Sequence, residues 1–313
     1  PYDHLDVTTA RAVIDRALAE GRMMLTEPEA KTLMQACHIP IVETRVARSP
    51  EEAAALAVDM GFPVAVKLLS PDISHKTEVG GVALYLSSSK SVKDAASAMQ
   101  QRLAVLRPDA KLNGFSVQTM IRRPDAHELI VGITSDPIFG PVILFGQGGI
   151  AVEVLQDHAL ALPPLNDVLA RDAIMRTRVS KLLAGYRNRP AADMNAISQV
   201  LTQVAHLAAE LPVVSELDIN PLLADNAGVI ALDARVLLKP QHLRHPHDRL
   251  AIRPYPQMLE EVAQWRGSEL MLRPIRPEDG EAHLRFFSAL DPVDVRFRMF
   301  MTMRDLQPSQ LAR

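Results

Sequence analysis

The sequence has one cysteine, few aromatic residues and almost no net charge. Cys37 stands alone among 313 residues, which excludes an internal disulfide and a cysteine-rich metal site. The formal charge of −3 does not provide the broad positive potential by which proteins attract nucleic acid or anionic membranes. We therefore expect no nucleic-acid partner, and any bound phosphate must be held by a local group of side chains.

Long apolar runs are also missing. No stretch approaches the roughly 20 residues needed to cross a bilayer, and no basic segment followed by an apolar one opens the chain. We expect a cytoplasmic protein without a membrane partner. The 48% hydrophobic residues can still form a substantial core, in two domains or one large one. Because the chain starts at Pro1 and stops at Arg313 within a polar segment, we interpret it as a piece of a longer protein.

Short β-branched runs alternate with longer helical patterns over much of the chain. Thr26 begins a capped helix, with Pro28 in the first turn and Glu29 at the third position. Residues 41–145 predict alternating strands and helices, and residues 168–210 are mainly helical. Three short strands are expected to follow, over residues 213–217, 222–224 and 229–233. This order predicts a layered α/β or α+β domain.

The stretch VAVKLLSPDISHKTEVGGV, residues 64–82, holds the first candidate site. Lys67 closes an apolar strand and could meet a phosphate, although a lone strand lysine usually only decorates the surface. His75 is either a phosphoryl acceptor or a loop residue that makes hydrogen bonds. Lys76 follows it, and the pair Gly80-Gly81 permits close backbone approach to a ligand.

The second candidate stretch is rich in glycine. A strand ending at Phe145 runs into Gly146, Gly148 and Gly149, which either cradle an anion through backbone N–H groups or form a plain turn. The Walker A ending GK[ST] is absent from this stretch.

The last motif is SELDINPLLADNAGVIALDARVLL, residues 215–238. Asp218, Asn220 and Asp233 offer hard oxygen ligands that suit Mg²⁺ shared with substrate phosphates. The alternative is that Asp218 and Asn220 only cap a turn.

Three residues on earlier strands complete the set. Glu128 lies within an apolar run and faces either solvent or a polar ligand. Gln118 and Met120 end a strand before a turn that could contact an adenine edge, whereas core packing is the alternative for Met120.

In this order, SPDISHKTEVGGV, DPIFGPVILFGQGG and ELDINPL resemble the ATP-grasp domain of the β subunit of ADP-forming acetyl-CoA synthetases, and more distantly that of succinyl-CoA synthetase. The resemblance covers about Leu25 to Leu238. It implies an ATP-grasp fold of two α/β subdomains with a nucleotide cleft between them. ATP or ADP and Mg²⁺ are the implied cofactors.

The resemblance also implies a role for each candidate residue. His75 would relay phosphate to the nucleotide, Asp218 would help to position a phosphohistidine, and Asn220 and Asp233 would carry magnesium. The residues expected to bind the nucleotide are Lys67, Lys76, Gly80, Gly81, Gln118, Met120, Glu128, Gly146, Gly148 and Gly149.

Residues 270–300 resemble the opening strand and first helices of a GNAT acetyltransferase, with RPIRPED at 273–279 as the strand-to-helix entry. The acetyl-CoA loop R/Q-x-x-G-x-G/A of that superfamily is absent from the sequence, so this chain alone should not acetylate. We expect four segments: an N-terminal linker and helix at 1–24, an ATP-grasp domain at 25–239, a linker at 240–268 and a truncated GNAT start at 269–313.

The leading functional hypothesis is a regulatory Mg-ATP or Mg-ADP-binding module of a bacterial protein lysine acetyltransferase. That parent protein would use acetyl-CoA, contain CoA-binding and GNAT domains in the same chain, and act on protein substrates such as acyl-CoA synthetases. The first alternative is a subunit of an NDP-forming acyl-CoA synthetase that transfers phosphate through a phosphohistidine. The second is a degenerate ATP-grasp scaffold.

Overall fold

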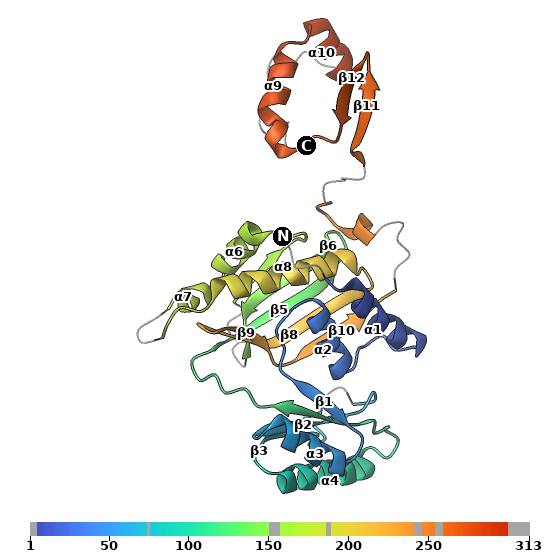
Figure 1. Cartoon of the computed structure of the whole chain (residues 1–313), viewed down its shortest axis with the longest axis vertical. Helices are drawn as coiled ribbons and strands as arrows, with labels where there is room; N and C mark the ends of the chain where they lie inside the picture. Colours follow the sequence, from blue (N-terminus) through green and yellow to red (C-terminus); the bar gives the residue numbers. More distant parts are fainter. Residues whose placement is uncertain are drawn as a thin grey trace. The chain divides into compact units, whose positions relative to one another are not determined.

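The computed structural model describes residues 5–73, 76–149, 157–185, 189–240, 246–253 and 259–299. The chain divides into two compact units, Pro1–Arg253 and Pro254–Arg313. In the described part of the chain, no helix is both long and apolar enough to cross a membrane. Figure 1 shows the elements of each unit.

The first unit contains a small antiparallel sheet with two helices on one face (Figure 1). Its strands, in spatial order, are β1 (Thr44–Ala47), β4 (Gly114–Thr119), β2 (Val64–Leu69) and β3 (Val82–Leu86). Helices α3 (Pro50–Met60) and α4 (Ser89–Leu106) cover the face that carries Val64, Val66 and Leu68. Because side chains alternate along a strand, Lys67 projects from the opposite face of β2.

A larger antiparallel sheet forms the rest of this unit. Its spatial order is β10, β8, β5, β6 and β7, and β9 pairs with β8. The strands are β5 (His127–Asp136), β6 (Gly140–Gln147), β7 (His158–Ala161), β8 (Val214–Asp225), β9 (Gly228–Ala231) and β10 (Ala234–Leu238). Figure 1 shows helix α8 (Met194–Glu210) lying across the sheet, where its apolar residues form one core with Leu129, Phe145 and Ile219.

Among the described residues, the large-sheet half also contains α1 (Val7–Ala19), α2 (Glu27–Ala36), α6 (Asp167–Met175), α7 (Ser180–Leu183) and the short 3-10 helix η2 (Pro246–Arg249). The predicted capping box of α2 is confirmed, because the N3 side chain of Glu29 accepts from the backbone N–H of Thr26 at 2.8 Å. Helix α1 contributes Ala10, Ile14 and Ala17 to the main core, although residues 1–24 were expected to lie outside the ATP-grasp domain.

The third motif folds differently from our expectation. We expected two strands separated near Asn220 and Pro221, yet β8 is one strand from Val214 to Asp225. A proline has no N–H for a ladder bond, which favours a break. The strand continues because the pairing register with β5 shifts between Leu129 and Val131, opposite this point. The next strand, β9, ends at Ala231 and not at Asp233, and β7 and β10 were not predicted.

The second unit contains a hairpin and two helices. Strands β11 (Glu261–Trp265) and β12 (Ser268–Leu272) pair in antiparallel fashion, and α9 (Gly280–Ser288) and α10 (Pro292–Met299) follow. Strand β11 lies inside the stretch 240–268 that was expected to be a linker. Glu261 and Gln264 lie three residues apart, so the polar positions do not follow the period of two that indicates a strand, and the sequence did not reveal it.

Candidate functional site

Three lysines converge on one buried carboxylate where helix α2 meets the small sheet. The Oε1 atom of Glu27 lies 3.0 Å from Lys67 Nζ and 3.1 Å from Lys31 Nζ, and Oε2 lies 2.6 Å from Lys76 Nζ. These four residues are called the lysine cluster. Lys31 belongs to α2, Lys67 to β2, and Lys76 to the loop that follows β2. The cluster therefore joins the large-sheet half to the small-sheet half of the unit.

The cluster reaches the surface through Asp233. Lys67 Nζ lies 3.5 Å from Asp233 Oδ2, and the Asp233 side chain is 47% exposed while that of Glu27 is 4% exposed. Asp233 precedes β10, whose first residue, Ala234, pairs with Ile219 of β8. The antiparallel register thus places Asn220 next to Asp233 at the same end of the ladder. Lys67, which the resemblance assigns to the nucleotide, therefore lies close to Asn220 and Asp233, which it assigns to magnesium.

The inner end of the cluster is closed by neutral side chains. Lys31 Nζ donates to Thr44 Oγ1 at 2.6 Å and to Gln118 Oε1 at 2.8 Å. Because an ammonium group is only a donor, the Gln118 amide oxygen must face Lys31. Gln118 is 6% exposed, so it lies beneath the cluster and does not present an open edge to a base. Met120 is half-buried just beyond β4, where its N–H donates to Pro63.

Sequence reasoning missed Glu27 and Lys31. Both lie on the buried face of α2 together with Ala30 and Met34. The four positions follow the helical spacing i, i+3, i+4 and i+7. Charged residues on the apolar stripe of an amphipathic helix are a usable signal, because a buried charge needs a partner. The capping box at Thr26 already accounted for the charged residues at the start of the helix, so the buried charges of Glu27 and Lys31 were not recognised.

The pKa values in the cluster follow from burial and ion pairing. Burial opposes the ionised form of Glu27, but Lys67, Lys31 and Lys76 outweigh it and lower the pKa of the carboxyl. Burial would likewise lower the pKa of Lys67, but Glu27 and Asp233 more than compensate and raise it. For Lys31, burial prevails over Glu27 and lowers the pKa. One carboxylate among three ammonium groups leaves two net positive charges.

Acid is expected to remove the stabilisation that Glu27 provides. The pKa of this carboxyl falls from 4.5 to about 2, so its contribution is complete above about pH 4.5 and is lost as the pH falls toward 2. Glu27→Gln should lower the free energy of unfolding by about 3 kcal/mol at neutral pH. Urea denaturation from about pH 7 to pH 3 should show that this difference shrinks with acid.

Glu43→Gln is the control for this measurement, because Glu43 forms only an exposed pair with Arg45 and should change the free energy of unfolding by less than about 1 kcal/mol. A difference between wild type and Glu27→Gln that stays constant down to pH 3 would contradict the assignment.

The glycine motifs have structural roles in this fold. The N–H groups of Gly80 and Gly81 donate to Thr77 O and Lys76 O, so they close a turn. A Cβ at Gly146 would lie 2.3 Å from Asp157 O, and one at Gly148 would lie 2.7 Å from Leu129 O.

Gly149 has a φ of +74°, and a Cβ there would lie 2.2 Å from the Glu128 carboxylate. Gly148 N–H also donates to Glu128 O at 2.8 Å. Gly148, Gly149 and Glu128 therefore form a second group, and no hydrogen bond or ion pair between described residues joins it to the lysine cluster. Whether either glycine motif also contacts a ligand stays a prediction.

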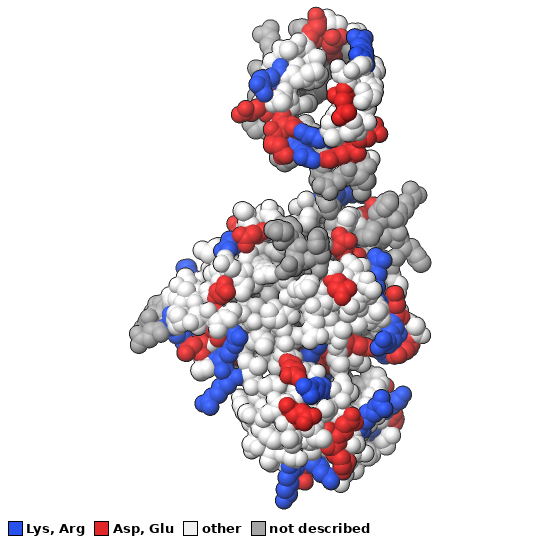
Figure 2. Space-filling model, in the orientation of Figure 1, with Lys and Arg blue, Asp and Glu red and all other residues white. Residues whose placement is uncertain are grey.

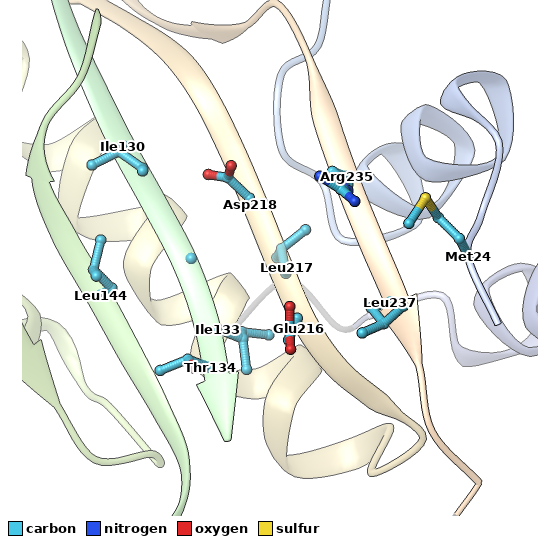
Figure 3. Close-up of a pocket in the computed structure, with 11 residues that line it drawn as sticks. Met24, Ile130, Ile133, Thr134, Leu144, Glu216, Leu217, Asp218, Arg235 and Leu237 are labelled. Carbon is cyan, nitrogen blue, oxygen red and sulfur yellow. The ribbon is translucent and has the colours of Figure 1, made fainter. Parts of the chain in front are cut away.

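Asp218 lines a pocket of about 320 Å³ on the open face of the large sheet. Figure 3 shows Asp218 on β8 across from Arg235 of β10, and Glu216 farther along β8 beside Leu237. Burial raises the pKa of Asp218, and Asp233 adds to this rise while Arg235 opposes it. The remaining lining residues are Met24, Ile130, Gly132, Ile133, Thr134, Leu144, Leu217 and Leu237. Asp218 and Asp233 are thus electrostatically linked, on the side of the site that was expected to hold metal and phosphohistidine. His75 lies outside the described residues.

This donor set fits a phosphate-bound magnesium ion. Asp233 offers a half-exposed carboxylate next to Lys67, and hard oxygen ligands of this kind bind Mg²⁺ jointly with substrate phosphates. Among the described residues, no group of three or more His, Cys, Asp or Glu side chains could hold a metal alone. Figure 2 shows acidic and basic side chains interspersed on the visible face. At this site the lysine cluster provides a local positive charge for a phosphate.

The two antiparallel sheets, with lysines and carboxylates between them, define a nucleotide-binding class of fold, and comparison with known proteins identifies it. A family model for the ATP-grasp domain matches residues 16–238. The chain belongs to the ATP-grasp family, of the type found in the β subunits of NDP-forming acetyl-CoA synthetases.

Three relatives illustrate the match. The β subunit of acetate–CoA ligase (ADP-forming) I from Pyrococcus furiosus is 38% identical, over 74% of this chain and 99% of the relative. The 4-hydroxybutyrate–CoA ligase (ADP-forming) of Nitrosopumilus maritimus is 33% identical, over 72% of this chain and 32% of that longer protein. Acetyl-coenzyme A synthetase 1 of Ca. Korarchaeum cryptofilum, solved with coenzyme A and Mg-AMPPCP, gives a TM-score of 0.65 at 32% identity, over 74% of this chain and 100% of that chain. These relatives favour the synthetase alternative over the acetyltransferase module that the sequence analysis placed first.

Proposed function

We propose that residues 16–238 are the nucleotide-binding part of an NDP-forming acyl-CoA synthetase and bind Mg-ATP or Mg-ADP between the two sheets. The observation that carries this proposal is the approach of Lys67 Nζ to Asp233 Oδ2, at 3.5 Å. It brings a cation from the small sheet to a metal-binding type of carboxylate on the large sheet. Lys67 and Lys76 bind the phosphates, and Asp233 and Asn220 hold magnesium.

The reaction class is phosphoryl transfer, in which positioning and charge neutralisation provide most of the rate. Magnesium, when bound, neutralises charge on the phosphate oxygens. The two net positive charges of the lysine cluster act on the same oxygens from the other side. His75 is the proposed phosphoryl acceptor, next in sequence to Lys76, and Asp218 positions the phosphohistidine. Met120 and Glu128 are proposed to lie by the adenosine, whereas the buried Gln118 supports Lys31 beneath the cluster.

The proposed partner is a CoA-binding unit with its own phosphohistidine segment. In the Ca. Korarchaeum cryptofilum structure, a phosphohistidine segment points towards the nucleotide-binding site. The relatives include a β subunit that the match covers almost completely and a longer chain of which it covers 32%, so such a unit can be a separate subunit or part of one chain.

The acetyltransferase context stays a proposal of its own. The family match ends at residue 238, ahead of the hairpin and helices of the second unit. If residues 269–313 begin a GNAT domain, the parent protein uses acetyl-CoA to acetylate lysines of target proteins, and the nucleotide site regulates it.

Calorimetric titration with Mg-ATP tests the proposed site. Wild type should bind, and Lys67→Ala should weaken binding at least about 30-fold, because truncating one buried charged contact costs about 2 kcal/mol or more. Lys93→Ala is the control, since Lys93 is exposed and pairs only with Glu51. Absence of heat with wild type, or equal affinity in Lys67→Ala, would discard the nucleotide site and leave the scaffold alternative.

A further inference from the structure

Glu27 is too buried to touch a nucleotide, yet it contacts every lysine of the cluster. We propose that Glu27 is a positioning residue, which holds Lys67 and Lys76 aimed at the phosphates while Lys31 supplies its countercharge. The inference rests on the nucleotide site proposed above and assigns a function to two residues of α2 that lie behind it.

The two carboxylate oxygens divide the work. Oε1 accepts from Lys67 at 3.0 Å, and Oε2 accepts from Lys76 at 2.6 Å. Each free lysine side chain has about 2 kcal/mol of rotamer entropy to lose on binding a ligand. A carboxylate that orders both ammonium groups beforehand removes part of that cost, which is the general benefit of preorganisation.

Lys31 serves the carboxylate and not the ligand. Its side chain is 5% exposed, and its Nζ is already occupied by Glu27, Thr44 and Gln118. A buried carboxylate shared by Lys67 and Lys76 alone would leave only one net positive charge. With Lys31 as the third ammonium group, Glu27 anchors the two outer lysines and a charge of plus two remains for an incoming phosphate.

Helix α2 is fixed in a way that suits this function. Its first turn is held by the capping box and by the Arg22 guanidinium, which donates to both Glu29 oxygens at 2.8 Å. Glu27 sits at the first position of the helix, so its backbone cannot drift. The same helix packs on β10, the strand that follows Asp233. Helix α2 therefore contacts both the lysines that would bind phosphate and the strand that follows the proposed magnesium ligand.

The test measures the affinity for Mg-ADP in wild type, Glu27→Gln and Glu29→Gln at about pH 7.5. A glutamine keeps the shape but has one oxygen acceptor, so at least one lysine loses its anchor. We expect affinity about tenfold weaker at pH 7.5 in Glu27→Gln.

Glu29→Gln is the matched control in the same helix. It removes the cap but leaves each lysine of the cluster its Glu27 partner, so it should lose clearly less affinity than Glu27→Gln.

The outcomes separate this inference from the function beneath it. If wild type does not bind Mg-ADP, the proposed function fails. If wild type binds and Glu27→Gln matches it in affinity, or Glu29→Gln loses as much affinity as Glu27→Gln, Glu27 is not a positioning residue. Should Glu27→Gln not fold, Glu27→Asp keeps the charge but is shorter by about 1.5 Å. It should release Lys76 and bind like Lys76→Gln, and wild-type affinity in Glu27→Asp would overturn the inference.

Discussion

Incubation of the chain with Mg²⁺ and ATP labelled on the γ-phosphate should leave acid-labile phosphate on the protein, and His75→Gln should abolish it. In the expected step an imidazole nitrogen bonds to the γ-phosphorus, the bond to the bridging oxygen breaks, ADP leaves and the imidazole loses a proton. The reason to expect it is sequence proximity: Lys76, the next residue, lies 2.6 Å from the Glu27 carboxylate within the lysine cluster. Label retention after acid and after base treatment gives the measurement.

His158→Gln is the control for this experiment, because His158 opens strand β7 and has an exposed side chain outside the cluster. It should keep the label, whereas Lys67→Ala should lose it together with the nucleotide. If wild type binds nucleotide and takes no label, the synthetase function is wrong for this chain. The regulatory module then becomes the better hypothesis.

Gly146→Ala should lower the free energy of unfolding by about 3 kcal/mol. The added Cβ would lie 2.3 Å from Asp157 O and 3.0 Å from His158 Cα, so β7 would have to move away from β6. Urea denaturation followed by far-ultraviolet circular dichroism measures the loss. Because the glycine allows strand packing, the affinity of the folded molecules for Mg-ATP should not change.

Gly21→Ala is the matched control, since a Cβ at Gly21 meets nothing within 4 Å and strains only a φ of +72°. It should cost about 1 kcal/mol. Lost nucleotide affinity in Gly146→Ala without lost stability would instead return this glycine to the binding site.

The element pattern of the first unit was largely predictable. The alternation of strands and helices that was expected over residues 41–145 is present, and the capped helix at Thr26 has its capping box. Both are local features, because the hydrophobic pattern of a strand and the cap of a helix depend on residues that are close in the sequence. The continuous strand through Pro221 was not predictable in this way, since the register shift that accommodates the proline lies in β5, about 90 residues earlier in the chain.

Only part of the candidate site was predictable from the sequence. The resemblance placed Lys67 at the nucleotide and Asp233 at the magnesium, and the two side chains do lie close together. The glycines could not be interpreted from sequence, because the atoms that require them belong to Arg102, Leu129 and Asp157. Glu27 was hidden for the same reason: two of its lysines are 40 and 49 residues away.

Strand β8 is hydrogen-bonded to β5, β9 and β10, so the strand that carries Asp218 and Asn220 is held by its neighbours in the sheet. The main chain passes between the large-sheet half and the small-sheet half after Val42, which donates to Ala231, and before Arg123, which pairs with Asp225. A rotation of β1–β4 and their helices about these two connections would lengthen the ion pairs from Glu27 to Lys67 and Lys76.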